Sequence, residues 1–154
     1  MRNKPYVFRG IAISALMLIV HFVMYVIAFA ILSFIFLFLL ELPLIGKLFN
    51  ILFFLRGDTP TMVAQIIAAQ IAYYATKFIQ TKTNKHLLTK GLSYKICGIV
   101  FLIIYVPSLV INIFDGAGSS IFANILFIIT AGIYFWKASD CKEEFLNTDD
   151  QEIN

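Results

Sequence analysis

The fold of this chain follows first from residues 11–40, which read IAISALMLIVHFVMYVIAFAILSFIFLFLL and contain no Asp, Glu, Lys or Arg. As an α-helix this run would be roughly 45 Å long, at a rise of 1.5 Å per residue. The hydrocarbon core of a bilayer is about 30 Å thick, so such a helix must tilt or project beyond it. Residues 11–40 therefore predict a first membrane span.

Three later runs, residues 62–76, 96–114 and 116–136, are also free of charged side chains. The whole chain is 60% hydrophobic and 14% charged, whereas soluble domains average about 25% charged residues. We therefore predict an all-α integral membrane protein with four transmembrane helices, at about residues 11–40, 61–79, 94–114 and 117–137. Residues 1–139 would form the transmembrane domain, and residues 140–154 an acidic cytoplasmic tail.

The basic residues flank these spans unevenly. Most of them lie in the N-terminal arm, in residues 77–95 and in residues 137–142. Because Lys and Arg are retained on the cytoplasmic side of a membrane, this distribution predicts a multi-pass protein with both termini in the cytoplasm.

The connections between the spans differ in kind. Residues 44–56 are apolar but too short to cross the bilayer, and they contain Lys47 and Arg56, which predicts an interfacial helix on the outer face. Residues 115–120 read DGAGSS, a short turn that would pair the last two spans as an antiparallel hairpin. Pro107 lies near the middle of the third span, where it predicts a kink.

Small side chains recur along one stripe of the second span. Close helix packing in membranes relies on small residues at this spacing. The stripe predicts either packing within one four-helix bundle or an interface between copies of the chain, and in an oligomer the same residues would be able to face a pore. Its members are Ala64, Gln65, Ala68, Ala72 and Thr76.

The spans offer little that could carry out chemistry. His21 lies deep in the first span, and an ionisable side chain at that depth is a candidate functional group. No span contains a carboxylate to relay a proton from it, and a neutral imidazole can be satisfied by a backbone carbonyl, so a structural role is favoured. We find no catalytic constellation and no metal-ligand spacing, and we expect neither an enzyme nor a bound cofactor.

Two segments of opposite charge are predicted on the cytoplasmic side. One interpretation is that they only set the orientation of the chain in the membrane and keep the tail soluble. The other is that they bind a soluble protein, such as a DNA-binding one. We expect no direct binding of nucleic acid by this chain. Without a partner, the acidic segment has a composition typical of disorder. The candidate partner-binding residues are Lys82, Lys85, His86 and Lys90 in the basic segment, and Asp140, Glu143, Glu144, Asp149, Asp150 and Glu152 in the acidic one.

These observations favour a non-enzymatic, homo-oligomeric membrane sensor or scaffold that recruits a cytoplasmic protein. Two alternatives stay open. One is a small oligomeric channel or membrane-permeabilising effector lined by the second span, and the other is an immunity or exclusion protein that intercepts a toxin or phage component in the membrane.

The layout of four spans, a basic middle segment at residues 77–95 and an acidic tail at residues 140–154 resembles the membrane subunit of the Kiwa anti-phage defence system, and this resemblance implies a place in the bacterial inner (plasma) membrane. The resemblance covers the whole chain as a matter of size and layout, without a diagnostic motif. It implies an oligomeric sensor of phage attack that recruits a cytoplasmic DNA-binding partner. On this resemblance, residues 44–58 would report envelope disturbance and the acidic tail would hold the partner.

Overall fold

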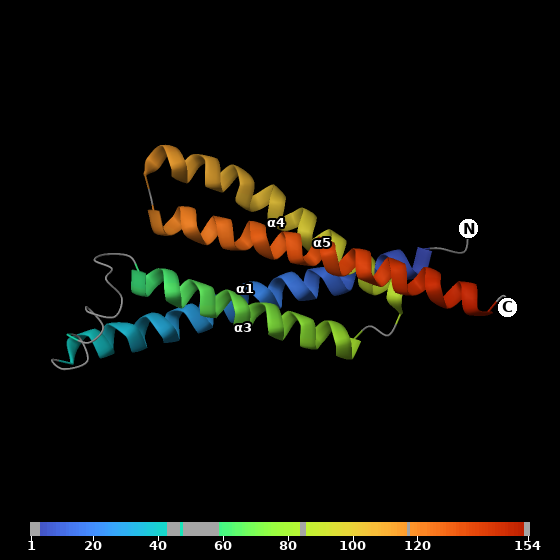
Figure 1. Ribbon diagram of the computed structural model, residues 1–154, viewed down its shortest axis with the longest axis horizontal. Helices are drawn as coiled ribbons and strands as arrows, with labels where there is room; N and C mark the ends of the chain where they lie inside the picture. Colours follow the sequence, from blue (N-terminus) through green and yellow to red (C-terminus); the bar gives the residue numbers. More distant parts are fainter. Residues whose placement is uncertain (1–3, 43–46, 48–58, 84–85, 117, 153–154) are drawn as a thin grey trace.

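The computed structural model describes residues 4–42, 47, 59–83, 86–116 and 118–152, and these residues form four helices. They are α1 (Lys4–Glu41), α3 (Thr59–Thr83), α4 (Leu87–Asp115) and α5 (Gly118–Glu152) (Figure 1). Each contains a stretch long and apolar enough to cross a membrane: Val7–Leu39, Pro60–Thr83, Leu87–Asp115 and Gly118–Lys142. The predicted all-α architecture with four candidate spans is therefore confirmed.

The helices extend beyond the predicted spans, because adding a residue to an existing helix costs far less than starting one. α4 begins at Leu87 rather than near residue 94, so most of the basic middle segment is helical. α5 runs on to Glu152, and the expectation of a disordered tail is wrong as far as that residue. Pro107 lies inside α4 without ending it. The predicted interfacial segment, residues 44–56, lies outside the described residues apart from Lys47.

The helices pack as two pairs, α1 with α3 and α4 with α5 (Figure 1). The α4–α5 pair is the predicted hairpin. Gly116 ends α4 in the left-handed conformation, with φ 68° and ψ 20°, and its N–H donates to the carbonyl of Asn112. Glycine adopts this conformation without a steric penalty, which lets the chain reverse within a few residues. The first residues of α1 and the last residues of α5 lie at the same end of the bundle (Figure 1). We call this the basal end, and the end with the Gly116 turn the apical end.

The two pairs are joined where α1 crosses α4 near the basal end. The Ser93 hydroxyl lies 3.1 Å from the carbonyl of Gly10 in α1 and 2.8 Å from that of Thr89 in its own helix, and the Cys97 thiol lies 3.7 Å from the carbonyl of Ser14. A Cβ atom added to Gly10 would lie 2.8 Å from Cδ2 of Leu92, so the helices approach as closely as they do because Gly10 has no side chain. Small residues permit such close backbone contact in membranes.

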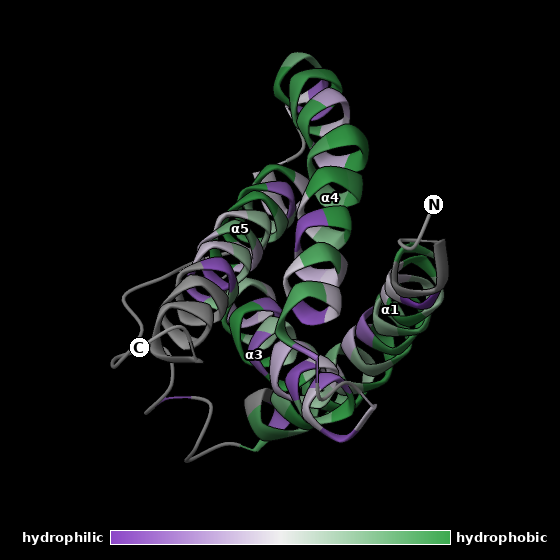
Figure 2. Cartoon of the chain, turned by 90° about the vertical axis from the view of Figure 1, so that its right-hand side faces the viewer, coloured by the Kyte–Doolittle hydropathy of each residue, from purple (hydrophilic) through white to green (hydrophobic). Residues whose placement is uncertain are grey.

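The outer sides of the helices are largely hydrophobic, as Figure 2 shows in a view from the basal end. Large apolar side chains such as Ile19, Phe34, Ile103 and Phe114 are exposed there. Buried positions, in contrast, include many small and polar side chains. An apolar exterior around an interior that mixes aromatic, small and polar side chains is expected of a bundle whose solvent is lipid, since apolar burial then provides no driving force for association.

Candidate functional site

The small-residue stripe of α3 faces the interior of the chain's own bundle. The side chains of Ala64, Ala68, Ala72 and Thr76 have no exposed area, and Gln65 is 6% exposed. The structure therefore places the stripe on a surface between helices of one chain. A pore lined by these residues would require α3 to leave that packing. The stripe also continues one turn further than predicted, to the fully buried Gln80.

The polar members of the stripe link α3 to other helices. The Gln65 amide donates to the carbonyl of Ser119 in the first turn of α5, at 3.4 Å. The Gln80 amide donates to the carbonyl of Lys90 in α4, at 3.1 Å. The Thr76 hydroxyl donates to the carbonyl of Ala72 within α3, at 2.7 Å. Gln65 and Gln80 thus satisfy part of their hydrogen-bonding capacity across helix interfaces, where an unpaired amide is costly.

A buried polar cluster lies at the centre of the bundle, around His21. Nδ1 of His21 in α1 lies 3.2 Å from the hydroxyl of Tyr134 in α5 and 3.5 Å from that of Thr76 in α3. The ring is fully buried, and Phe101 of α4 packs edge-on against it, with the ring centroids 5.0 Å apart. All four helices therefore contribute to the surroundings of one imidazole. We call His21, Thr76, Tyr134 and Phe101 the His21 cluster.

The hydrogen-bond partners around His21 bear on which ring nitrogen carries the proton. Thr76 gives its proton to Ala72, so its oxygen can only accept from His21. If Nδ1 carries no proton, it accepts from the Tyr134 hydroxyl, which is the shorter of its two contacts. Nε2 of His21 has no hydrogen-bond partner among the described residues. A neutral imidazole accepting from Tyr134 satisfies the phenol and leaves the Nε2 proton among aromatic rings.

This arrangement favours a connecting role for His21 over chemistry. No carboxylate belongs to the cluster, and within the described residues no group of three or more His, Cys, Asp or Glu side chains is placed to hold a metal ion. The imidazole instead joins α1 of one helix pair to α5 of the other. A separation of the two pairs at this level would break the Tyr134 contact.

The predicted basic partner-binding residues lie at the basal end where they are described. Lys82 is exposed, with its ammonium group 5.8 Å from the centroid of the Phe78 ring. His86 is also exposed, immediately before α4, and its side chain makes no capping bond to that helix. Lys90 is half-buried in the first turns of α4. Lys85 lies outside the described residues.

The predicted acidic residues all lie on α5. The carboxylate of Asp140 accepts from Lys137 one turn earlier, at 2.8 Å, so this acid is paired within its own helix. Glu143, Glu144, Asp149, Asp150 and Glu152 are on the continuation of α5, where the structure describes the backbone and leaves the side chains undescribed. The structure thus places the acids along one helix, and the one acidic side chain that it describes there, Asp140, pairs with Lys137 of the same helix.

Two contacts escaped the sequence reasoning: Tyr134 with His21, and Ser93 with Gly10. Their residues are separated by 113 and 83 positions, so no local pattern pairs them. A signal for the surfaces was nevertheless present. Small or polar residues recur four apart in the third helix as Thr89, Ser93 and Cys97, as they do in the second. Applying the same four-residue spacing to every helix would have predicted which face of each helix is buried.

Searches with this sequence and structure against protein-family models, curated proteins and solved structures found no match.

Proposed function

We propose that this protein is a scaffold or sensor in the bacterial inner membrane that recruits a soluble cytoplasmic protein to its basal end. The observation that carries the proposal is the segregation of charge in the folded chain. Exposed basic side chains at the basal end include Arg9, Lys77, Lys82, Lys95 and Lys142. The described charged residues at or between the apical ends of the helices are Glu41, Lys47 and Asp115, of which only Lys47 is basic. The positive-inside rule assigns the basal end to the cytoplasm.

The extension of α5 supports a docking role for the acidic segment. The candidate span of α5 ends at Lys142 and the helix continues to Glu152, which is roughly 15 Å further. A helix that is already formed loses less conformational entropy on binding than a disordered tail would. An acidic rod of this kind is complementary to a partner with a basic surface, such as a nucleic-acid-binding protein.

The resemblance to the Kiwa membrane subunit agrees with this proposal and extends it. On that resemblance the scaffold is a homo-oligomer, its partner binds DNA, and the signal is phage attack on the envelope. The His21 cluster suits a sensor because it joins the two helix pairs, whose apical ends carry the outer connections. The channel alternative has less support, because its proposed lining is buried inside a single chain.

The proposal can be tested by removing the negative charges of the acidic segment. Glu143, Glu144 and Glu152 are changed to Gln, and Asp149 and Asp150 to Asn, in the full chain carrying an affinity tag. We expect the amount of soluble partner that co-purifies from native membranes to fall by about tenfold or more, since several charge pairs would be lost together. The control neutralises the apical acids Glu41 and Asp115, and it should retain the partner.

The measurement is quantitative mass spectrometry of the soluble proteins that each variant retains. The proposal requires one soluble protein that the parent chain and the apical control retain equally and the neutralised chain loses. Membrane insertion of all three must be equal by fractionation. An identical set of retained soluble proteins for the neutralised and parent chains would rule out docking through the acidic segment.

A further inference from the structure

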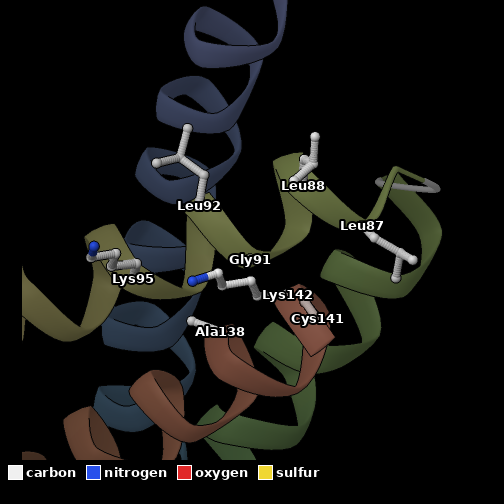
Figure 3. Close-up of a pocket in the computed structure, with 8 residues that line it drawn as sticks. All are labelled: Leu87, Leu88, Gly91, Leu92, Lys95, Ala138, Cys141 and Lys142. Carbon is white, nitrogen blue, oxygen red and sulfur yellow. The ribbon is translucent and has the colours of Figure 1, made fainter. Parts of the chain in front are cut away.

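At the basal end, the two helix pairs are fixed to each other by close approaches of α4 to its neighbours. Leu92 of α4 lies against Gly10 of α1. One residue earlier, a Cβ added to Gly91 would lie 3.3 Å from Cβ of Cys141 in α5 (Figure 3). α4 is thus held between α1 and α5 at this level, and from there α1 and α4 diverge toward the apical end (Figure 1). We call these contacts the basal hinge.

Beyond the basal hinge, polar side chains link the pairs. Nδ1 of His21 lies 3.2 Å from the Tyr134 hydroxyl, and the Gln65 amide donates to the carbonyl of Ser119. Both bridging side chains are buried, and each leaves one polar atom, Nε2 of His21 and Oε1 of Gln65, without a hydrogen-bond partner among the described residues. A buried polar atom without a partner costs free energy that contact with water would recover. The links beyond the hinge are therefore only partly satisfied while the pairs are together.

Of these two links, only His21 can change its charge near neutral pH. In its neutral form, Nδ1 accepts from the Tyr134 hydroxyl. A proton on Nδ1 converts this acceptor into a donor, so the phenol loses the acceptor for its own proton. The same proton adds a positive charge to a ring that is fully buried. Protonation thus removes a link between the pairs and introduces a charge that the closed bundle must bury.

The surroundings of His21 offer no negative charge to balance that proton. Every member of the His21 cluster belongs to a run without Asp, Glu, Lys or Arg. The charged residues that follow these runs most closely are the cations Lys77 and Lys137, and Lys137 is already paired with Asp140. The other titratable groups are phenols and a thiol, which are neutral at neutral and acidic pH. Within one helical turn of a cluster member, or stacked on one, they are Tyr25 of α1, Tyr73 of α3, Tyr94, Cys97 and Tyr105 of α4, and Tyr134 of α5.

We propose that His21 is an acid-sensitive latch: its neutral imidazole keeps the two helix pairs together, and its protonation lets them move apart about the basal hinge. Water that enters between the separating pairs supplies the proton and then solvates the charge, so the open form takes up the proton in preference to the closed form. Lowering the pH therefore favours the open form by linkage. The inference concerns the membrane-embedded helices alone and holds with or without a soluble partner at the basal end.

Pulsed electron paramagnetic resonance on the full chain in lipid nanodiscs measures the separation. Spin labels at Phe34→Cys in α1 and Phe114→Cys in α4 report on the apical ends of the two pairs, since both positions are exposed. We expect a longer distance to appear as the pH falls from about 8 to about 5, the range in which histidine ordinarily changes its charge. Below about pH 6.5, the ratio of open to closed molecules should rise by up to about tenfold per pH unit, as uptake of one proton requires.

The chain provides its own controls. Labels at Phe114→Cys and Ile129→Cys, both exposed and both in the α4–α5 pair, should keep one distance at every pH. His21→Gln retains a side chain that can accept from Tyr134 but takes up no proton, so its pairs should stay together throughout. His86→Gln removes the other histidine, which is exposed at the basal end, and should respond as the parent does. A response that persists in His21→Gln, or a single unchanged distance for the parent, would refute the latch.

A second measurement does not depend on the folding of His21→Gln. In His86→Gln, purified without a histidine tag, His21 is the one histidine of the chain. After ¹⁵N labelling of the imidazole, nuclear magnetic resonance therefore gives its protonation state directly. The neutral ring should dominate at about pH 8, and the imidazolium should appear in step with the longer distance as the pH falls. Separation of the pairs while His21 stays neutral, or an imidazolium in molecules that stay closed, would overturn the proposal.

Discussion

Replacing Gly98 with leucine is expected to lower the free energy of unfolding of the bundle by about 1 to 3 kcal/mol, the usual cost of overpacking a filled interior. A Cβ atom at Gly98 would already lie 3.0 Å from Cε2 of Phe135 and 3.2 Å from the carbonyl oxygen of Ala131. The remaining carbons of leucine have no space unless α4 and α5 separate. Because the carbonyl belongs to the backbone of α5, a side-chain rearrangement alone cannot relieve the contact.

The chain contains a matched control in Gly132, which is exposed and where an added Cβ meets no atom within 4 Å. Gly132→Leu should leave the stability unchanged or raise it by up to about 1 kcal/mol, since leucine favours the helix more than glycine does. Both variants would be unfolded reversibly in lipid–detergent bicelles. Equal stability of the two would show that α4 and α5 do not approach at Gly98 as the structure has it.

Removing the imidazole in His21→Ala is expected to destabilise the bundle by about 2 to 5 kcal/mol, as large-to-small changes at filled positions do. The ring lies among the side chains of Phe22, Phe101, Phe127 and Tyr134, which would be left around a cavity. His21→Phe restores most of the volume without the hydrogen bond. We therefore expect it to recover part of the loss and to leave the Tyr134 hydroxyl without its His21 contact.

A double-mutant cycle with His21→Phe and Tyr134→Phe isolates the polar contact. Side-chain hydrogen bonds in membranes couple by about 0.6 kcal/mol on average, and by up to about 1.7 kcal/mol. A coupling in this range is the predicted outcome, measured by the same unfolding in bicelles. Tyr74→Phe is the control for the phenol, because Tyr74 is exposed on α3, and its effect should add independently to that of His21→Phe. A coupling of zero between His21 and Tyr134 would contradict a direct contact.

The spans and their pairing were largely predictable from the sequence. A membrane span can be recognised from composition alone, as residues 11–40 show. An apolar side chain suits a lipid environment whichever helix packs beside it. The short DGAGSS turn likewise determines that α4 and α5 are neighbours. The helix ends were harder to predict, because the lysines of residues 77–95 read as loop by composition. The described ones lie instead on the basal turns of two helices that continue past the apolar core, Lys77 and Lys82 on α3 and Lys90 and Lys95 on α4.

The interior was predictable only in outline. The alanine stripe indicated a packing face on α3, but its partner helices could not be read from it. The His21 cluster depends on which of many aromatic residues reaches His21, and the chain contains 16 Phe and 7 Tyr. That selection is made by the crossing of α1 over α4 near Gly10 and by the close approach of α4 to α5 at Gly98.

The central claim is that the basal end faces the cytoplasm, since the soluble partner is expected there. Labelling of single introduced cysteines with a membrane-impermeant maleimide tests this in intact bacteria. Asp115→Cys lies at the apical end and Thr81→Cys at the basal end, both at exposed positions. The native Cys97 and Cys141 are buried, so the parent chain measures the background. Labelling of Asp115→Cys in intact cells, with Thr81→Cys labelled only after permeabilisation, is the predicted result. The reverse pattern would place the basal end outside the cell and contradict the account.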